Sequence, residues 1–173
     1  MQLTASQDLE APLEAVFRHL TDVQRLERQA MRRGVEVQRV GATDAPAVGS
    51  AWDIRFPYRG SERHLRTRIV EVCAPESVAL ETRTAGIRAL TYVELTPLAP
   101  GRTRLAMASE LTSDSLKGRL LIRSLWLAKG RLTERLQAGL RAFAADLENA
   151  TASGAPRSGA APPERHPSAA PCR

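Results

Sequence analysis

Glu71 is the residue of this chain whose position comes closest to that of a catalytic group. It lies in the run Ile69, Val70, Glu71 and Val72, which is typical of a β-strand. Unbroken alternation along that strand places Glu71 on the apolar face of a sheet, where a carboxylate away from water could act as a general base or anchor a ligand. A bulge near Val70 would instead turn Val70 and Val72 inward and leave Glu71 in water. Both arrangements stay open, and Glu71 is the one candidate catalytic residue.

Other arrangements that support catalysis or metal binding do not occur in the sequence. The three histidines, His19, His64 and His166, have no partners at a metal-ligand spacing, and neither do Cys73 and Cys172. There is no Ser-His-Asp arrangement, glycine-rich phosphate loop or His-Glu-x-x-His string. The sequence therefore predicts no metal and no cofactor, and it favours binding over catalysis.

Apolar and hydroxyl side chains that alternate along the strands form a second group with a chemical use. A wall of this kind could hold a nonpolar molecule, and its hydroxyl groups could orient a polar group of that molecule. The alternative is that threonine is simply a good strand residue and that the large side chains fill a core. The residues expected to contact the ligand are Trp52, Ile54, Phe56, Leu65, Thr67, Leu80, Thr82, Thr91, Val93, Met107, Leu125, Leu132 and Leu136.

Arginines gather on the opposite side of the same strands. The net charge is +6, and Lys117 and Lys129 are the only lysines among the 25 basic residues. The expected pairing sets Arg68 opposite Arg83 and Arg83 opposite Arg88, although like charges facing each other across a sheet are destabilising. Such a row could receive phosphates or an acidic partner, or the long side chains could spread apart in water. Charge alone leaves nucleic acid open as a partner.

Turn residues set the register of these strands. Four turns, recognised by their Gly, Pro and polar residues, connect the segments between about residues 52 and 111. The predicted pairs are Asp53 with Arg66, Ile54 with Leu65, Ile69 with Thr82, Leu80 with Thr91, Thr82 with Ala89, Val93 with Met107 and Leu95 with Leu105. All four hairpins collect their apolar side chains on one face, which predicts a continuous antiparallel meander with its other face in water.

The sequence segments before and after the meander have helical patterns. Residues 1–9 alternate as a first strand, and two short helices follow, one beginning at Pro12 and one covering about residues 23–33. In the second helix, Leu26, Ala30 and Met31 are expected to face inward.

The chain after the meander predicts one long helix. Ser113 or Asp114 caps it, and it runs to about Asn149. Gly130 lies in its interior, where glycine costs about 1 kcal/mol relative to alanine, so a bend is expected there. Its apolar stripe is Leu121, Leu125, Ala128, Leu132, Leu136, Leu140, Phe143 and Leu147.

This order of elements resembles the helix-grip superfamily, which includes START lipid-transfer domains, polyketide cyclases and the birch-pollen allergens (SRPBCC). The resemblance covers about residues 1–149, and the chain is most similar to small bacterial members. It implies an α+β fold, with a curved antiparallel sheet of about seven strands wrapped on a long C-terminal helix and a hydrophobic cavity between them. The features that carry it are the helix start at 12–17, the Gly49-Ser50-Ala51-Trp52 segment, the Ala74-Pro75-Glu76 connection and the closing helix.

Three functions are compatible with these features. The first is binding or transport of a small hydrophobic molecule, lipid-like, aromatic or polyketide-like, by a domain of residues 1–149. The second is a cyclase or dehydratase acting on a ketone substrate through Glu71 or the cavity hydroxyls. The third is an interaction module that binds RNA, the ribosome or another acidic partner through Arg68, Arg83 and Arg88.

Residues 150–173 are rich in Ala, Pro, Ser and Gly and are predicted to be a disordered tail. No apolar run is long enough to span a membrane, and the first residues lack the pattern of a signal peptide, so a cytoplasmic protein is expected.

Overall fold

The structure, a computed structural model, describes residues 1–41, 47–58 and 60–153. Its elements are β1 (Gln2–Leu9), α1 (Leu13–Leu20), α2 (Val23–Arg32), β2 (Glu36–Val40), β3 (Ala51–Tyr58), β4 (Ser61–Cys73), β5 (Ser77–Thr84), β6 (Ile87–Ala99), β7 (Arg102–Thr112), α3 (Leu116–Leu127) and α4 (Lys129–Ser153). The predicted α+β helix-grip fold is confirmed, including the two short helices after the first strand. Residues 150–153 of the predicted tail belong to α4, so the tail prediction is wrong there, and its part beyond residue 153 lies outside the described residues.

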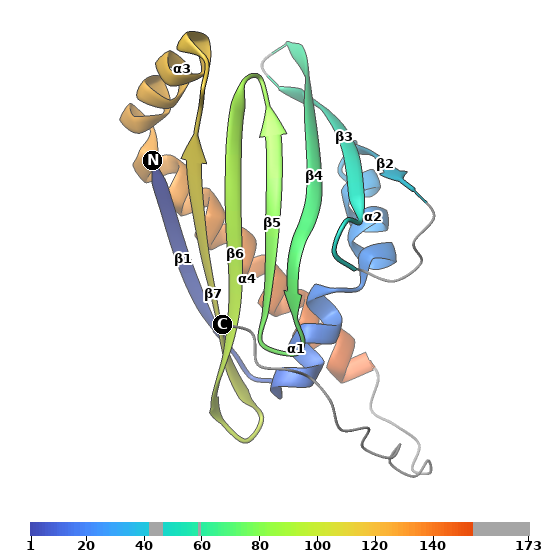
Figure 1. Ribbon diagram of the computed structural model, residues 1–173. Coiled ribbons are helices and arrows are strands. Elements are labelled where there is room, and N and C mark those ends of the chain that lie inside the picture. The colour runs from blue at the N-terminus through green and yellow to red at the C-terminus, as the bar shows by residue number, and fades with distance from the viewer. Residues whose placement is uncertain (42–46, 59, 154–173) are drawn as a thin grey trace.

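The seven strands form one curved antiparallel sheet in the order β1-β7-β6-β5-β4-β3-β2. Strands β2 to β7 follow one another as a meander, and β1 closes the other edge by pairing with β7. Helices α1, α2 and α4 lie against one face, called the inner face below, and α4 crosses it diagonally (Figure 1). The pairs predicted for the β3–β4, β5–β6 and β6–β7 hairpins are confirmed.

The β4–β5 hairpin differs from the predicted register by two residues. Ile69 faces Leu80 rather than Thr82. Strand β4 continues to Cys73, which faces Ser77, so the connection is one residue shorter than predicted, and a bulge at Val70 adds the second residue of shift. A shift of two keeps each side chain on its face, so the faces predicted as far as Ile69 hold although the partners change.

The bulge determines where Glu71 lies. Beyond Val70 the alternation is reversed, and Glu71 faces Ala79 on the outer face with its side chain exposed. Val72 packs inward instead. Of the two arrangements predicted for Glu71, the one with a bulge near Val70 is confirmed and the one inside the cavity is wrong, so Glu71 is no longer a candidate catalytic residue.

The same shift changes the partners of the arginines. Arg68 faces Glu81, so the prediction that it faces Arg83 is wrong, and Arg66 takes that place. Arg83 faces Arg88 as predicted.

The two N-terminal helices form where expected. Pro12 stands at the N-cap of α1, and Asp22 caps α2 by accepting a hydrogen bond from the Arg25 backbone. Met31, however, is exposed rather than turned inward. It lies one residue beyond Ala30, about 100° further around the helix, and so it points away from the sheet.

The predicted single C-terminal helix is two helices. Ser115 caps α3 in place of the predicted Ser113 or Asp114, and α3 ends at Leu127 with Ala128 as its C-cap, two residues before the glycine where a bend was expected. Helix α4 then packs its buried residues Leu140, Ala144 and Leu147 into the core, whereas α3 lies beyond the end of β7 (Figure 1).

The core has two parts with different roofs. In the first, α4 and α1 pack on β1, β6 and β7 around Leu9, Val16 and Leu105. In the second, Trp52, Ile69 and Val78 from β3, β4 and β5 lie beneath α1 and the start of α2. The helices nearest to the second part are short, and α2 has no buried residue, so this part of the inner face is less completely filled.

Candidate functional site

An apolar cavity lies between the inner face of the sheet and the first two helices. Its volume is about 310 Å³, at the lower end of the range for small-molecule pockets. The end of α1 and the helix α2 form its roof, and strands β2 to β6 form its floor. Eleven of its fourteen lining residues are apolar. The lining residues are Leu20, Thr21, Val23, Leu26, Glu27, Ala30, Val37, Trp52, Ile54, Thr67, Ile69, Val78, Leu80 and Val93.

Glu27 is the acid among these lining residues, and hydrogen bonds hold its carboxylate in place. Oε1 accepts from Trp52 Nε1 at 2.8 Å and from Arg39 Nε at 3.1 Å, and Oε2 accepts from Arg39 Nη2 at 3.1 Å. A carboxylate offers roughly four acceptor positions, so these three bonds leave one for a donor group of a ligand. Glu27 thus places an oriented carboxylate acceptor on a wall whose other polar residues are Thr21 and Thr67.

Glu27 was not among the predicted site residues, although its spacing contained a signal. Val23, Glu27 and Ala30 are separated by four and three residues, which places them on one side of a helix. Once Ala30 was assigned inward, Glu27 belonged to the same side.

Polar side chains attach the roof to the rest of the molecule. Arg25 Nη1 lies 2.8 Å from Asp146 Oδ2 on α4, and Gln29 Nε2 donates to the same oxygen. The Glu27 bonds described above attach the other side of α2 to β2 and β3. Since α2 has no buried residue, these polar contacts contribute a large share of what holds it over the cavity.

Two pairs of hydroxyl groups extend across the inner face. Thr67 Oγ1 lies 2.9 Å from Thr82 Oγ1, and Thr91 Oγ1 lies 2.8 Å from Ser109 Oγ. In each pair one hydroxyl donates and the other keeps its proton free for a further acceptor. All four residues are partly exposed.

The residues that were predicted to contact a ligand lie in three different places in the structure. Trp52, Ile54, Thr67, Leu80 and Val93 line the cavity. Met107 packs instead against the core part covered by α4. The other seven, all partly exposed and outside this cavity, are Phe56, Leu65, Thr82, Thr91, Leu125, Leu132 and Leu136. The roof is α1 and α2, whereas the sequence analysis placed the C-terminal helix in that role.

His19 lies beside the contacts that hold the roof. Its ring packs edge-on against Phe143, with centroids 5.1 Å apart, and its Nε2 is buried with no hydrogen-bond partner among the described residues. Burial, followed by the charge of Arg25, lowers the pKa of His19, while Asp146 and Asp22 act in the opposite direction. The surroundings of His19 therefore favour its neutral form.

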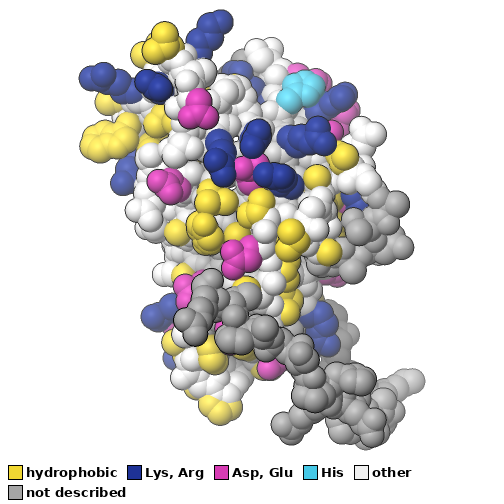
Figure 2. All heavy atoms as spheres, viewed as in Figure 1, with side chains coloured by type: hydrophobic (Ala, Val, Ile, Leu, Met, Phe, Trp, Pro, Cys, Tyr) yellow, Lys and Arg dark blue, Asp and Glu magenta, His cyan; other side chains and the backbone are white. Residues whose placement is uncertain are grey.

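The outer face carries an ion-pair cluster in place of an unpaired arginine row. Glu81, only 3% exposed, lies 3.0 Å from Arg68 Nε, 3.0 Å from Arg83 Nε and 2.7 Å from Arg88 Nε. Burial is the largest influence on the pKa of Glu81 and raises it, but the bonds from Arg83 and Arg68 together lower it below its usual value. Figure 2 shows the basic side chains surrounding a carboxylate on this face. The predicted row of like charges is therefore stabilised by ion pairs with Glu81 of the same sheet face.

Metal-binding groups and membrane-crossing helices were both considered over the described ranges. No group of three or more His, Cys, Asp and Glu side chains in residues 1–41, 47–58 and 60–153 could hold a metal ion. No helix in those ranges is long and apolar enough to cross a membrane.

An antiparallel sheet with helices packed against one face, and an apolar cavity between them, defines the helix-grip fold. Residues 1–148 match the family described as polyketide cyclase / dehydrase and lipid transport, and the chain belongs to this family.

Solved structures show the same fold. A norcoclaurine synthase mutant from Thalictrum flavum, in complex with a transition-state analogue, has a TM-score of 0.68 at 10% identity, covering 87% of this chain and 96% of that one. The Zhui aromatase/cyclase from Streptomyces sp. R1128 has a TM-score of 0.63 at 13% identity, over 86% and 94%.

A START superfamily protein from Mycobacterium smegmatis has a TM-score of 0.63 at 12% identity, over 87% and 99%. A comparison with curated proteins finds no match. At these identities the structural likeness concerns the fold alone.

Proposed function

We propose that this protein binds and carries one small, mainly apolar molecule in the cavity beneath α1 and α2. The observation that supports this most strongly is the cavity wall itself, in which eleven apolar residues surround a single carboxylate with one acceptor position left. A ligand that fits this wall is apolar over most of its surface and carries one hydroxyl or amino group.

The contacts of the roof support exchange of such a ligand. Moving α2 breaks hydrogen bonds to Glu27, Arg25 and Gln29, which water can replace, and uncovers little fully buried apolar surface. A cavity closed by a core helix would open at a much greater cost.

A catalytic role has less support from the described residues. Glu71 lies on the outer face, and Glu27 is bonded to Arg39 and Trp52, with no second titratable side chain among the cavity residues to complete an acid–base pair. The arrangement favours holding a molecule over transforming it.

Native mass spectrometry of the full chain purified from its own host tests the proposal. The expected result is a bound small molecule that is lost when Ala30, on the cavity wall, is replaced by Trp. Ala138→Trp on the exposed side of α4 is the matched control and should keep the ligand. A chain that carries nothing, or an Ala30→Trp variant that keeps its ligand, would contradict the proposal.

A further inference from the structure

Helix α3 presents apolar side chains to solvent as well as to the protein. Gly118 is buried, and Ile122 and Leu125 are partly buried on the inner side. On the outer side the exposed fractions are 83% for Leu116, 71% for Leu120 and 90% for Leu127. These three residues lie within about 40° of one another around the helix, so they form one stripe. Trp126, 63% exposed, lies beside this stripe.

The direction of this stripe is set by the way α3 is attached. A side chain on Gly118 would lie 2.5 Å from the carbonyl oxygen of Gly86 in the β5–β6 turn. Ser113 Oγ donates to that same carbonyl at 2.6 Å, and Ser115 Oγ accepts from the Gly118 backbone at 3.0 Å. The first turn of α3 is therefore held against the end of the sheet, and the leucines on its other side point outward.

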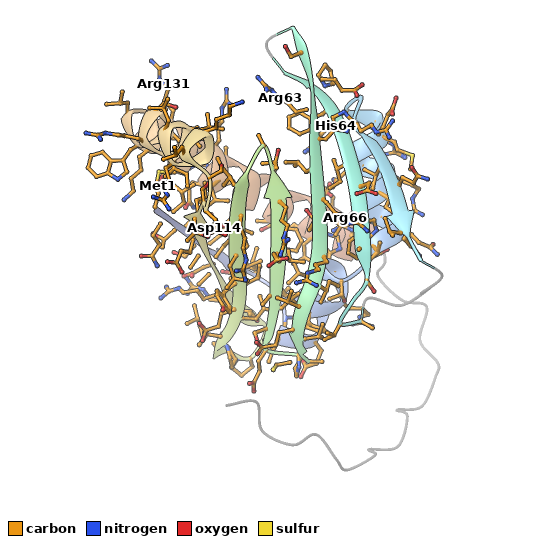
Figure 3. All side chains as sticks on the ribbon, turned by 45° about the horizontal axis from the view of Figure 1, so that its top comes forward. Met1, Arg63, His64, Arg66, Asp114 and Arg131 are labelled. Atoms are coloured by element: carbon orange, nitrogen blue, oxygen red, sulfur yellow. The ribbon has the colours of Figure 1, made fainter. Side chains whose placement is uncertain are left out.

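Basic side chains lie along α3 and in the first turn of α4. Between residues 115 and 133 the chain carries five basic residues and no acidic one, and two of the five are its only lysines. All five side chains are exposed. They are Lys117, Arg119, Arg123, Lys129 and Arg131. Arg131 points away from the sheet (Figure 3), and Figure 2 shows apolar and basic side chains side by side at the end of the molecule where α3 lies.

We propose that α3 docks this protein on the surface of a bilayer that contains anionic lipids. The outward leucines and Trp126 would enter the region between head groups and acyl chains, and the five cations would face the lipid phosphates. This is a surface contact, because no described helix could cross the bilayer.

Other occupants satisfy fewer of these features. In a symmetric contact between two copies, α3 would face itself and bring its cations together with no acid among residues 115–133. Nucleic acid would satisfy the cations but leave Leu116, Leu120 and Leu127 in water. A lipid surface accommodates both sets at once. The inference is independent of the cavity and of whether a ligand occupies it.

Vesicle flotation with the full chain tests the docking. Binding to phosphatidylcholine vesicles containing about one third phosphatidylglycerol should be at least about tenfold tighter than binding to phosphatidylcholine alone, and should weaken with salt. The triple variant Leu116→Ser, Leu120→Ser, Leu127→Ser should lose about tenfold or more of this binding. Leu98→Ser, an exposed leucine at the end of β6, is the apolar control and should bind like the parent.

Two double charge-reversal variants test whether the cations of α3, rather than the net charge of the chain, are responsible for the binding. Lys117→Glu with Arg123→Glu should abolish binding, whereas Arg28→Glu with Arg32→Glu, the same change of net charge on exposed positions of α2, should reduce it far less. Thermal unfolding of each variant checks that it is folded.

Trp126 provides a direct signal of contact. Its emission should shift to the blue on binding and be quenched by brominated lipids, and Trp126→Phe should remove both effects because Trp52 is buried. No binding to anionic vesicles, or binding unchanged in the serine variant, would overturn the proposal. So would a parent chain that is a dimer only while its α3 leucines are intact, or tighter binding to a polynucleotide that needs the cations but not the leucines.

Discussion

Glu27 on α2 accepts a hydrogen bond from the indole of Trp52 on β3 at 2.8 Å, and this bond joins the roof of the cavity to its floor. The same carboxylate oxygen accepts from Arg39 on β2, so one side chain connects three elements. The group that gives the cavity its polarity also helps to keep the cavity closed.

Glu27→Ala should therefore destabilise the protein and loosen the roof together. It removes the acceptor of three hydrogen bonds, which should lower the free energy of unfolding by about 1–3 kcal/mol. Amide exchange in α2 should rise as well. Gln24→Ala, an exposed change on the same helix, should alter the stability by no more than about 0.5 kcal/mol.

A double-mutant cycle isolates the bond to Trp52. Trp52→Phe alone, Glu27→Ala alone and the two together should show a coupling energy of at least about 0.5 kcal/mol in urea unfolding. Additive effects would mean that the two side chains do not interact in solution.

Glu81→Gln should destabilise the protein by leaving Arg68, Arg83 and Arg88 as uncompensated like charges. We expect a loss of about 1–3 kcal/mol, below that of a fully buried ion pair because the arginines are half exposed and regain water. Added salt should reduce the loss by screening the repulsion. Glu110→Gln, an exposed acid on β7, is the control and should change little.

The pH dependence of this loss has a definite sign. Because the pKa of Glu81 is lowered in the folded state, its ionisation stabilises the protein above the unfolded pKa of about 4.5, and that stability is lost as the pH falls through the folded value. The parent and Glu81→Gln should therefore become more alike in stability in acid. A difference that persists or grows in acid would contradict this origin.

Sequence periodicity predicted most of this fold because each hairpin has one solvent-facing face and one face that packs against the helices. Faces repeat every two residues, so Ile54, Leu65 and Thr67 were placed correctly from turn positions alone. The bulge at Val70 could be predicted only as one of two alternatives, because Ile69, Val70 and Val72 are all apolar and the alternation carries no mark of the extra residue. That ambiguity left the face of Glu71 undecided in the sequence.

The candidate site depended on contacts between a helix and two strands, which periodicity does not report. Glu27 became part of the cavity wall through its bonds to Trp52 on β3 and Arg39 on β2, two residues that face each other where these strands pair. The break at Ala128 likewise follows from two separate attachments, α3 to the β5–β6 turn and α4 to the core.

Gly118→Ala should destabilise the protein although alanine favours a helix. The added Cβ would contact Ser113 Oγ and lie 2.5 Å from the backbone oxygen of Gly86, which cannot rotate away. We expect a loss of about 1–3 kcal/mol in urea unfolding. Gly139→Ala in α4 has nothing within 4 Å of the added Cβ and should instead stabilise the protein by about 0.5–1 kcal/mol. Equal effects at the two positions would show that α3 does not rest closely on the turn.

His19 should make the free energy of unfolding depend on pH near neutrality. Its pKa is lowered in the folded state by burial and by the charge of Arg25, against Asp146 and Asp22, and its Nε2 has no acceptor among the described residues if it is protonated. An unfolded histidine titrates near its ordinary value of about 6.5, so below that pH the unfolded state binds more protons than the folded state. The stability is therefore fully present above about pH 6.5 and falls as the pH decreases toward the lowered folded value.

Urea midpoints measured from about pH 7.5 to about pH 5 should fall for the parent chain and stay nearly level for His19→Gln, which keeps a polar group of similar size. His64→Gln, in the exposed β3–β4 hairpin, is the matched control and should retain the parent's slope. The same slope in His19→Gln as in the parent would show that another group carries the dependence. Because Arg25 and Asp146 hold α2 over the cavity, protonation of His19 beside them should also increase amide exchange in residues 23–32. A change of pH that lowers stability without altering α2 would separate His19 from the roof.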